Sequence, residues 1–131
     1  MQIFGLLAVG GGAAAGAWLR WWLGTVLNSV FPTLPLGTLC ANLIAGLLMG
    51  FAMDFLGGHA ALPPEIRLLT TTGFLGGLST FSTFSAEVVT MLSHREYLWG
   101  LIAVSIHVVG SVAMTIIGIW VVRFLLTPGA T

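Results

Sequence analysis

Four long stretches of mainly apolar residues run along this chain, separated by short connections that are polar or contain proline. They cover residues 3–30, 36–55, 66–92 and 97–126. A helix needs about 20 apolar residues to cross a bilayer, and each stretch is long enough. The connections carry the prolines, glycines and charges that end a helix. The pattern therefore predicts an all-α integral membrane protein with four transmembrane helices in a single domain over residues 1–131.

Composition supports this assignment and excludes several functions. The 131 residues are 57% hydrophobic and only 6% charged, which is too apolar for a water-facing surface. The chain has no lysine and a formal net charge of zero, so a nucleic acid is not expected as a partner. The single cysteine, Cys40, is expected to be a packing residue. No basic residue precedes Arg20, so we expect the first stretch to be retained rather than removed as a signal peptide.

The third stretch is too polar at its midpoint to be a simple apolar helix. Gly76 and Gly77 precede five hydroxyl residues within the seven positions 79–85. Non-helical backbone at this depth is tolerated only where it is buried in protein or lines water. We therefore predict that the third helix is broken at mid-membrane. The alternative is an intact helix whose hydroxyls bond to carbonyls of the preceding turn.

Two other stretches carry polar residues near their middles. Asn42 is costly to place in hydrocarbon and must face protein or a wet path, so it either joins helices or lines a pore. His107, Ser111 and Thr115 recur every four residues and therefore share one helix face. Three polar residues in line predict a polar track rather than an isolated contact between helices.

Two phenylalanines and two ionic residues complete the candidate chemistry. Phe81 and Phe84 lie three apart on one helix face, where they either pack in a core or offer electropositive ring edges to an anion. Arg20 lies among tryptophans and is either an anchor at the membrane interface or a residue that attracts anions to a vestibule. Glu87 lies near a helix end, where simple solvation is one alternative.

The remaining features argue against an enzyme and favour a symmetric assembly. The sequence has no clustered metal ligands, no phosphate-binding loop and no nucleophile with a base partner, so no enzyme activity is expected. Arg67 and Arg123 would lie on the side of the termini, and Arg20 and Arg95 on the other. This even division predicts insertion in both directions and hence an antiparallel homodimer of dual topology. Small residues four apart, as at Gly46 and Gly50, predict close helix packing.

Three segments of the chain closely resemble the Fluc (CrcB) family of fluoride-specific ion channels. The resemblance extends over the whole chain, and the block in the third stretch is its most specific part. The matching residues are Gly12, Gly16, Ala17 and Arg20; then Pro35 to Leu39 and Asn42; then Thr72 to Gly77, Phe81 to Ser85 and Glu87.

The resemblance implies an antiparallel dual-topology dimer with two fluoride pores. It places the pore asparagine on Asn42, the pore phenylalanines on Phe81 and Phe84, and the vestibule arginine on Arg20. The polar track implied by the family comprises Ser82, Thr83 and Ser111, together with His107, where relatives often carry another polar residue. A structural sodium ion at the dimer axis would be held by the backbone carbonyls of Gly76 and Ser79, the latter standing where threonine is usual.

The expected function is therefore passive, fluoride-selective conduction out of the cell across the inner or plasma membrane, which confers fluoride resistance. Fluoride enters as neutral HF and dissociates inside, so an anion pathway and an inside-negative potential suffice for export. One alternative is a small dual-topology multidrug exporter, although positions 3–30 contain no carboxylate to bind cations. The other is a non-transporting membrane assembly subunit, which would explain close packing but not the polar residues.

Overall fold

The computed structural model describes residues 2–59 and 61–126, and all regular structure in these two ranges is helical. Three helices are long and apolar enough to cross a membrane, namely α1 (Gln2–Leu27), α2 (Leu36–Gly58) and α6 (Tyr97–Leu126). The third predicted stretch is a composite of α3 (Pro64–Arg67), the π-helix η1 (Leu68–Leu75), α4 (Gly76–Leu78) and α5 (Phe81–Ser93). The chain is a multi-pass membrane protein, as predicted.

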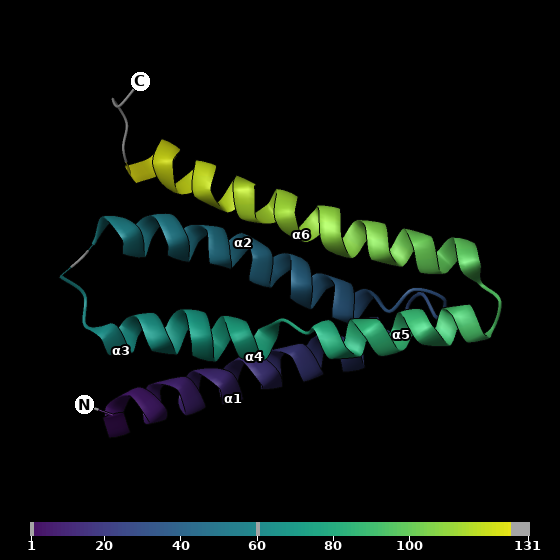
Figure 1. Ribbon diagram of the computed structural model, residues 1–131, viewed down its shortest axis with the longest axis horizontal. Helices are drawn as coiled ribbons and strands as arrows, with labels where there is room; N and C mark the ends of the chain where they lie inside the picture. The colour runs from purple at the N-terminus through teal and green to yellow at the C-terminus, as the bar shows by residue number, and fades with distance from the viewer. Residues whose placement is uncertain (1, 60, 127–131) are drawn as a thin grey trace.

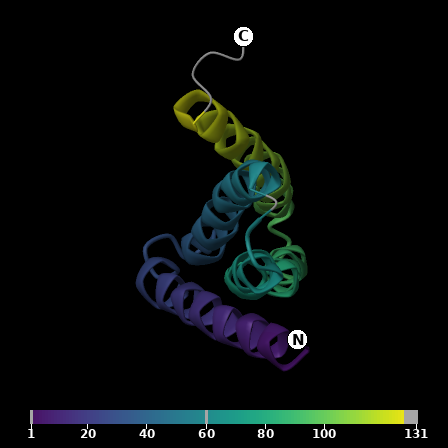
Figure 2. The same cartoon turned by 90° about the vertical axis from the view of Figure 1, so that its left-hand side faces the viewer.

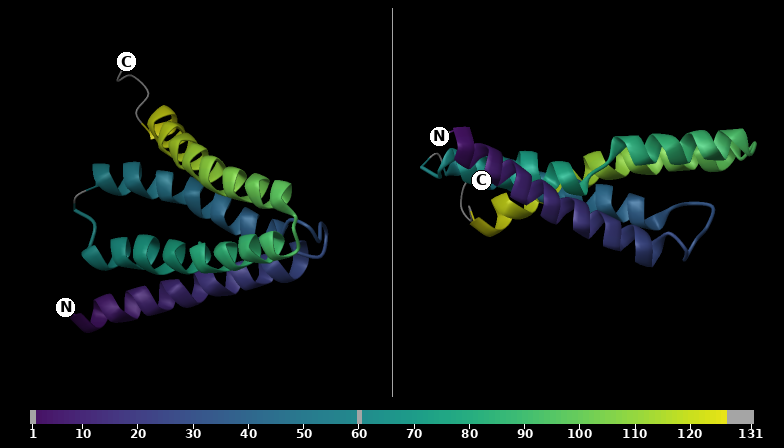
Figure 3. Two further views of the ribbon diagram at one scale, coloured as in Figure 1. Left: turned by 45° about the vertical axis from the view of Figure 1, so that its right-hand side comes forward. Right: turned by 90° about the horizontal axis from the view of Figure 1, so that it is seen from below.

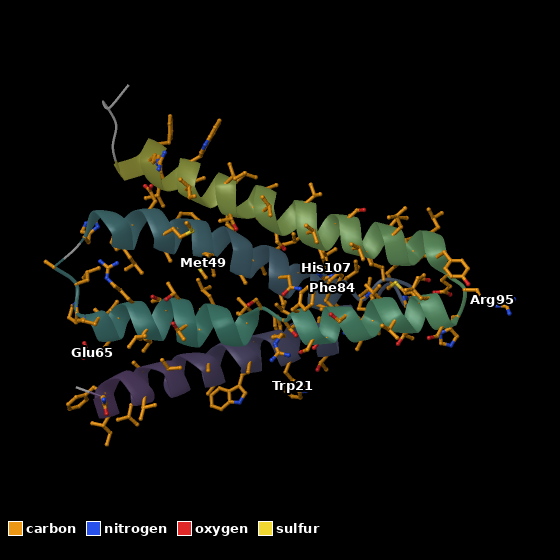
Figure 4. The ribbon with its side chains drawn as sticks, in the orientation of Figure 1. Trp21, Met49, Glu65, Phe84, Arg95 and His107 are labelled. Atoms are coloured by element: carbon orange, nitrogen blue, oxygen red, sulfur yellow. The ribbon has the colours of Figure 1, made fainter. Side chains whose placement is uncertain are left out.

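The four stretches alternate in direction. Figure 1 shows the N-terminal end of α1, the end of α6 and the connection from α2 to α3 at one end of the molecule, with the other two connections at the opposite end. Arg123 and Arg67 therefore lie toward the terminal end, and Arg95 lies in the turn at the far end (Figure 4). α2 packs mainly on α6, and α1 packs mainly on η1 and α4. Figures 2 and 3 show α1 crossing the composite segment at an angle.

The first helix ends earlier than the apolar pattern predicted. It was expected to reach Val30 but ends at Leu27, and residues 28–34 form turns. Asn28 explains this end, because its Oδ1 accepts a hydrogen bond from the backbone N–H of Gly37 at 2.8 Å. Its side chain thereby ties the end of α1 to the start of α2.

The break in the third segment lies at Ser79 and Thr80. Both residues have extended backbone, with φ −75° and ψ 153° at Ser79 and φ −150° and ψ 121° at Thr80. The predicted break is therefore confirmed, and the intact-helix alternative is wrong. Backbonding by hydroxyls does occur, since Ser79 Oγ donates to Leu75 O at 2.8 Å, but it ends α4 rather than continuing it. Thr80 then caps α5, because its Oγ1 accepts from the N–H of Thr83 at 3.2 Å.

Close helix packing at small residues is confirmed at both main helix pairs. A Cβ added to Gly16 would lie 2.7 Å from Leu78 N, where α1 meets α4. A Cβ on Gly50 would lie 2.9 Å from Ile119 N, where α2 meets α6. Backbone cannot yield as a flexible side chain can, so these glycines fix how closely the helices approach.

Replacing Gly50 by alanine is therefore expected to destabilise the protein by about 1–3 kcal/mol, the usual cost of overpacking. Gly11→Ala is the matched control, because Gly11 also lies within a helix and a Cβ there meets no atom within 4 Å. Denaturant unfolding in mixed micelles measures both variants. Equal stability of the two would contradict backbone contact at Gly50.

Candidate functional site

A groove of about 420 Å³ lies beside the break and is lined by residues from α2, η1, the break, α5 and α6. It brings together six of the predicted site residues. These six are Asn42, Ser79, Phe81, Phe84, His107 and Ser111. Thr115, the third member of the predicted track on α6, lines the groove as well.

Asn42 pairs with the backbone of the break. Its Oδ1 accepts from the N–H of Thr80 at 2.7 Å, and its Nδ2 donates to the carbonyl of Thr80 at 3.0 Å. Because the break removes both Thr80 groups from helical hydrogen bonding, this amide satisfies polar backbone that would otherwise be costly in a membrane. Nδ2 also lies 3.1 Å from His107 Nδ1, which links α2 to α6.

His107 is held between Asn42 and the ring of Phe84. It is only 5% exposed, and its ring is stacked on Phe84 with centroids 4.5 Å apart and an interplanar angle of 27°. Figure 4 shows the two side chains together between α5 and α6, close to the break. The imidazole is thus fixed on both sides by residues that line the same groove.

The two phenylalanines contact each other but differ in burial. Their ring centroids are 5.6 Å apart at 66°, an edge-to-face arrangement. Phe84 is 7% exposed, whereas Phe81 is 78% exposed in the single chain. Sequence reasoning placed both on one helix face and could not predict this difference. Phe84 therefore belongs to the packed wall of the groove, and Phe81 projects from it.

Arg20 does not line the groove. Its Nε donates to the carbonyl of Gly77 at 3.0 Å, so the side chain caps a carbonyl at the end of α4. This contact, like that of Gly16 with α4, brings this part of α1 beside the break. The anchor at the membrane interface and the vestibule residue both stay predictions. No buried side-chain nitrogen or oxygen in the described residues lacks a partner, so the remaining guanidinium N–H groups are accessible.

Ser82 and Thr83 lie on the α5 side of the break and outside the groove. Thr80 Oγ1 donates to Thr83 Oγ1 at 3.0 Å and lies 3.4 Å from Ser82 Oγ. Thr83 instead lines a second cavity, of about 520 Å³, together with Glu87. The predicted polar track is therefore divided between two cavities, and Thr80, which sequence reasoning did not single out, hydrogen-bonds toward both.

Glu87 is half-buried rather than simply solvated. It accepts a hydrogen bond from the hydroxyl of Thr38, which is 4% exposed, and thus links α5 to α2. Simple solvation therefore does not account for Glu87 alone, because the carboxylate also links two helices. The sequence partly indicates that Thr38 needs a polar partner, because Thr38 lies one turn before Asn42 and shares its helix face.

Gly76 and Ser79 are exposed at the break. Among the hydrogen bonds of the described residues outside regular helices, none ends on either carbonyl oxygen. Neighbouring carbonyls do have donors, since Leu75 O accepts from Ser79 N at 3.0 Å and Gly77 O accepts from Arg20. The structure therefore leaves these two carbonyls available to an external group.

The chain matches known proteins along nearly its full length. Residues 7–119 match the family model described as CrcB-like protein, Camphor Resistance (CrcB). The fluoride-specific ion channel FluC of Nitrosospira multiformis is 55% identical over 125 residues, which cover 95% of this chain and 98% of that protein. FluC of Ralstonia pickettii is 54% identical over 123 residues, covering 94% and 98%. FluC of Tolumonas auensis is 53% identical over 117 residues, covering 89% and 92%. With this coverage and identity, the chain belongs to the CrcB family.

Proposed function

We propose that this protein is a fluoride-selective passive ion channel that exports cytoplasmic fluoride across the inner or plasma membrane. The observation that carries the proposal is the groove at the helix break, where Asn42, His107 and two phenylalanines converge inside a multi-pass membrane protein. Relatives more than 50% identical are named fluoride-specific ion channels. The chain has no need of an energy source, because the membrane potential drives an anion outward.

Selectivity follows from the kind of donors at the groove. Fluoride holds its hydration shell tightly, so a pore must replace that shell with oriented N–H, O–H and ring-edge contacts. The groove and the adjoining break offer these donors from His107, Ser111 and Phe81, with Asn42 in the wall beside them, and Ser82 and Thr83 continue the series toward the second cavity. Arg20, with accessible N–H groups beside the break, supplies positive charge in a vestibule.

The test is reconstitution into liposomes loaded with fluoride or chloride, followed by ion-selective electrodes. Rapid fluoride release with negligible chloride release is expected. Equal release of both anions, or of neither, would refute the proposal.

The functional unit in this proposal is an antiparallel homodimer of a single transmembrane domain, surrounded by lipid and inserted in both orientations. Arg67 and Arg123 lie toward the terminal end of the bundle and Arg95 toward the far end, with Arg20 in the second half of α1, so insertion has no strong bias. Phe81, Gly76 and Ser79 are exposed in one chain, and a second copy packed on this side of the bundle would cover them.

Labelling of a single cysteine should report this dual topology. Gly58→Cys in a Cys40→Ala background places the thiol at an exposed end of α2, where a Cβ meets no atom within 4 Å. Impermeant maleimides should label it from both membrane faces. Two arginines added before Gln2 should bias insertion and lower flux, because oppositely oriented partners become scarce. Labelling from one face only, with full flux, would contradict the antiparallel dimer.

A structural sodium ion at the dimer axis completes the proposal. The carbonyls of Gly76 and Ser79 from two chains would bring four partial negative charges together, and oxygen ligands of this kind suit a hard cation. The fit rests on the absence of protein donors to these carbonyls among the described residues. Bound there, sodium would offset carbonyl repulsion and hold the two copies in register.

Replacing sodium on both sides of the membrane by a bulky organic cation is accordingly expected to reduce fluoride flux severalfold while the dimer stays folded. Flux and the dimer fraction on size-exclusion chromatography are measured in parallel. The matched control replaces chloride instead of sodium. Undiminished flux after exhaustive sodium removal would contradict the sodium site.

A further inference from the structure

The amide of Asn42 has only one orientation that its partners allow. Asn42 faces a donor and an acceptor on the same residue, the N–H and the carbonyl of Thr80. A flipped amide would set its NH2 against the Thr80 N–H and its oxygen against the Thr80 carbonyl. Amide orientations are assigned from such networks, and this one is fixed by backbone groups whose chemistry cannot change.

This orientation determines the protonation of His107. Both hydrogens of Asn42 Nδ2 are engaged, one on Thr80 O at 3.0 Å and the other toward His107 Nδ1 at 3.1 Å. Nδ1 must therefore accept, and in a neutral imidazole the proton then resides on Nε2. The imidazolium form would place two N–H groups against each other, so the contact is compatible only with the neutral ring.

The two other histidines have the opposite arrangement. His59 Nδ1 lies 2.7 Å from Phe55 O, and His94 Nδ1 lies 2.8 Å from Thr90 O. A carbonyl can only accept, so both Nδ1 atoms must carry a proton. The chain thus contains one histidine with a bare Nδ1 and two with a protonated Nδ1, which provides an internal comparison.

The Nε2 atom of His107 is accessible from the groove. No hydrogen bond of this atom is found among the described residues. Every buried side-chain nitrogen or oxygen there has a partner, so Nε2 cannot be buried even though the residue is only 5% exposed. Since His107 lines the groove and one ring face lies on Phe84, the small exposed part of the ring includes this N–H.

We propose that Asn42 is a positioning residue and that His107, through its Nε2–H, donates the hydrogen bond to the anion in the groove. The Thr80 N–H fixes the Asn42 amide, the amide fixes the imidazole tautomer, and the tautomer presents a neutral N–H donor. Asn42 itself has no free hydrogen for the anion in this arrangement. The inference rests on the proposed function for the identity of the anion, but the tautomer does not depend on it.

Nitrogen-15 NMR of histidine-labelled protein in nanodiscs tests the tautomer without transport. His107 is assigned by the signal that disappears in His107→Gln. We expect its Nδ1 to be unprotonated and its Nε2 protonated, whereas His59 and His94 should show protonated Nδ1. Added fluoride should shift the Nε2 proton of His107 and leave the other two unchanged. A protonated Nδ1 on His107 would overturn the proposal.

Two near-isosteric substitutions separate donation to the anion from support of Asn42. The glutamine amide nitrogen can reach the position of Nε2, so His107→Gln should retain fluoride flux within about threefold. Asparagine reaches only as far as Nδ1, so His107→Asn can still accept from Asn42 but offers no donor to the groove. We expect it to lose roughly tenfold or more in flux, as loss of a hydrogen bond to a charged group implies.

Flux is normalised to dimer yield in each case. A purely structural His107 would give the reverse order, with asparagine active and glutamine impaired, and this result would overturn the donor role. Wild-type protein that shows the expected tautomer but carries no fluoride would refute the proposed function and leave the tautomer assignment standing. Fluoride flux with no fluoride-dependent shift at His107 would refute the donor role alone.

Discussion

Replacing Asn42 by alanine is expected to reduce fluoride flux per protein by about a hundredfold or more, because several interactions are lost together. The Thr80 N–H and carbonyl lose their partner, and His107 loses the group that orients it. Unsatisfied backbone groups cost several kcal/mol where water is scarce, so the break itself should become less ordered. Initial efflux from liposomes and the yield of dimer are measured for the same preparation.

Asn28→Ala is the control for a general effect of losing an asparagine clamp. Asn28 also accepts a hydrogen bond from backbone, that of Gly37 at 2.8 Å, but it lies outside the groove. We expect this variant to lose stability and to keep its flux per dimer. A second variant, Asn42→Asp, can still accept from Thr80 N–H but cannot donate, so it should fold better than the alanine variant and conduct no better. Normal flux in both Asn42 variants would exclude a role in the pathway.

The four membrane segments could be predicted because lipid imposes a simple rule on sequence. Backbone must be hydrogen-bonded internally, so a long apolar stretch has to be helical even where it is rich in glycine. For the same reason the glycines and hydroxyls of residues 76–85 predicted the break correctly. The ends of helices follow from particular contacts instead. The hydrogen bond between Asn28 and Gly37 joins two segments, and an apolar pattern contains no information about it.

The π-helix η1 was not predicted. Its only local signal is the pair Thr70 and Thr71, whose hydroxyls donate to Ile66 O at 2.8 Å and to Arg67 O at 2.7 Å. Hydroxyl backbonding of this kind is compatible with an ordinary α-helix. η1 packs on α1, and such tertiary contact is not visible in composition or periodicity.

For the site, the sequence indicated which residues take part better than it indicated which of them contact one another. Asn42, Phe84 and His107 were singled out separately as polar or aromatic residues at mid-segment, and the fold brings them together. Their partnership spans 65 residues between Asn42 and His107, so no local pattern encodes it. The same limit applies to Arg20 and Glu87, whose partners Gly77 and Thr38 come from other helices. Residue type indicated that each needed a partner, and only the packing of α1 and α2 supplied one.

The phenylalanine pair best separates a pore from a packed core. Phe81→Ile and Phe84→Ile keep apolar bulk but delete the ring and its electropositive edge. We expect each to lower fluoride flux by about tenfold or more at similar dimer yield, because an isoleucine offers the anion no compensating contact. The two variants should differ in stability. Phe84 is buried on His107, so its loss should cost stability too, whereas Phe81 is 78% exposed in the single chain.

Phe31→Ile is the matched control, because Phe31 also forms an edge-to-face pair, with Trp99 at 5.3 Å and 61°, but outside the groove. It should change stability without changing flux. Phe→Met at positions 81 and 84 should retain more flux than isoleucine, since methionine keeps a soft, polarizable and flexible contact. If the phenylalanines only filled a core, all these substitutions would cost under about 1.5 kcal/mol of stability and leave flux per dimer intact. Normal conduction by both isoleucine variants would therefore remove Phe81 and Phe84 from the pore and leave His107 and the hydroxyls as its donors.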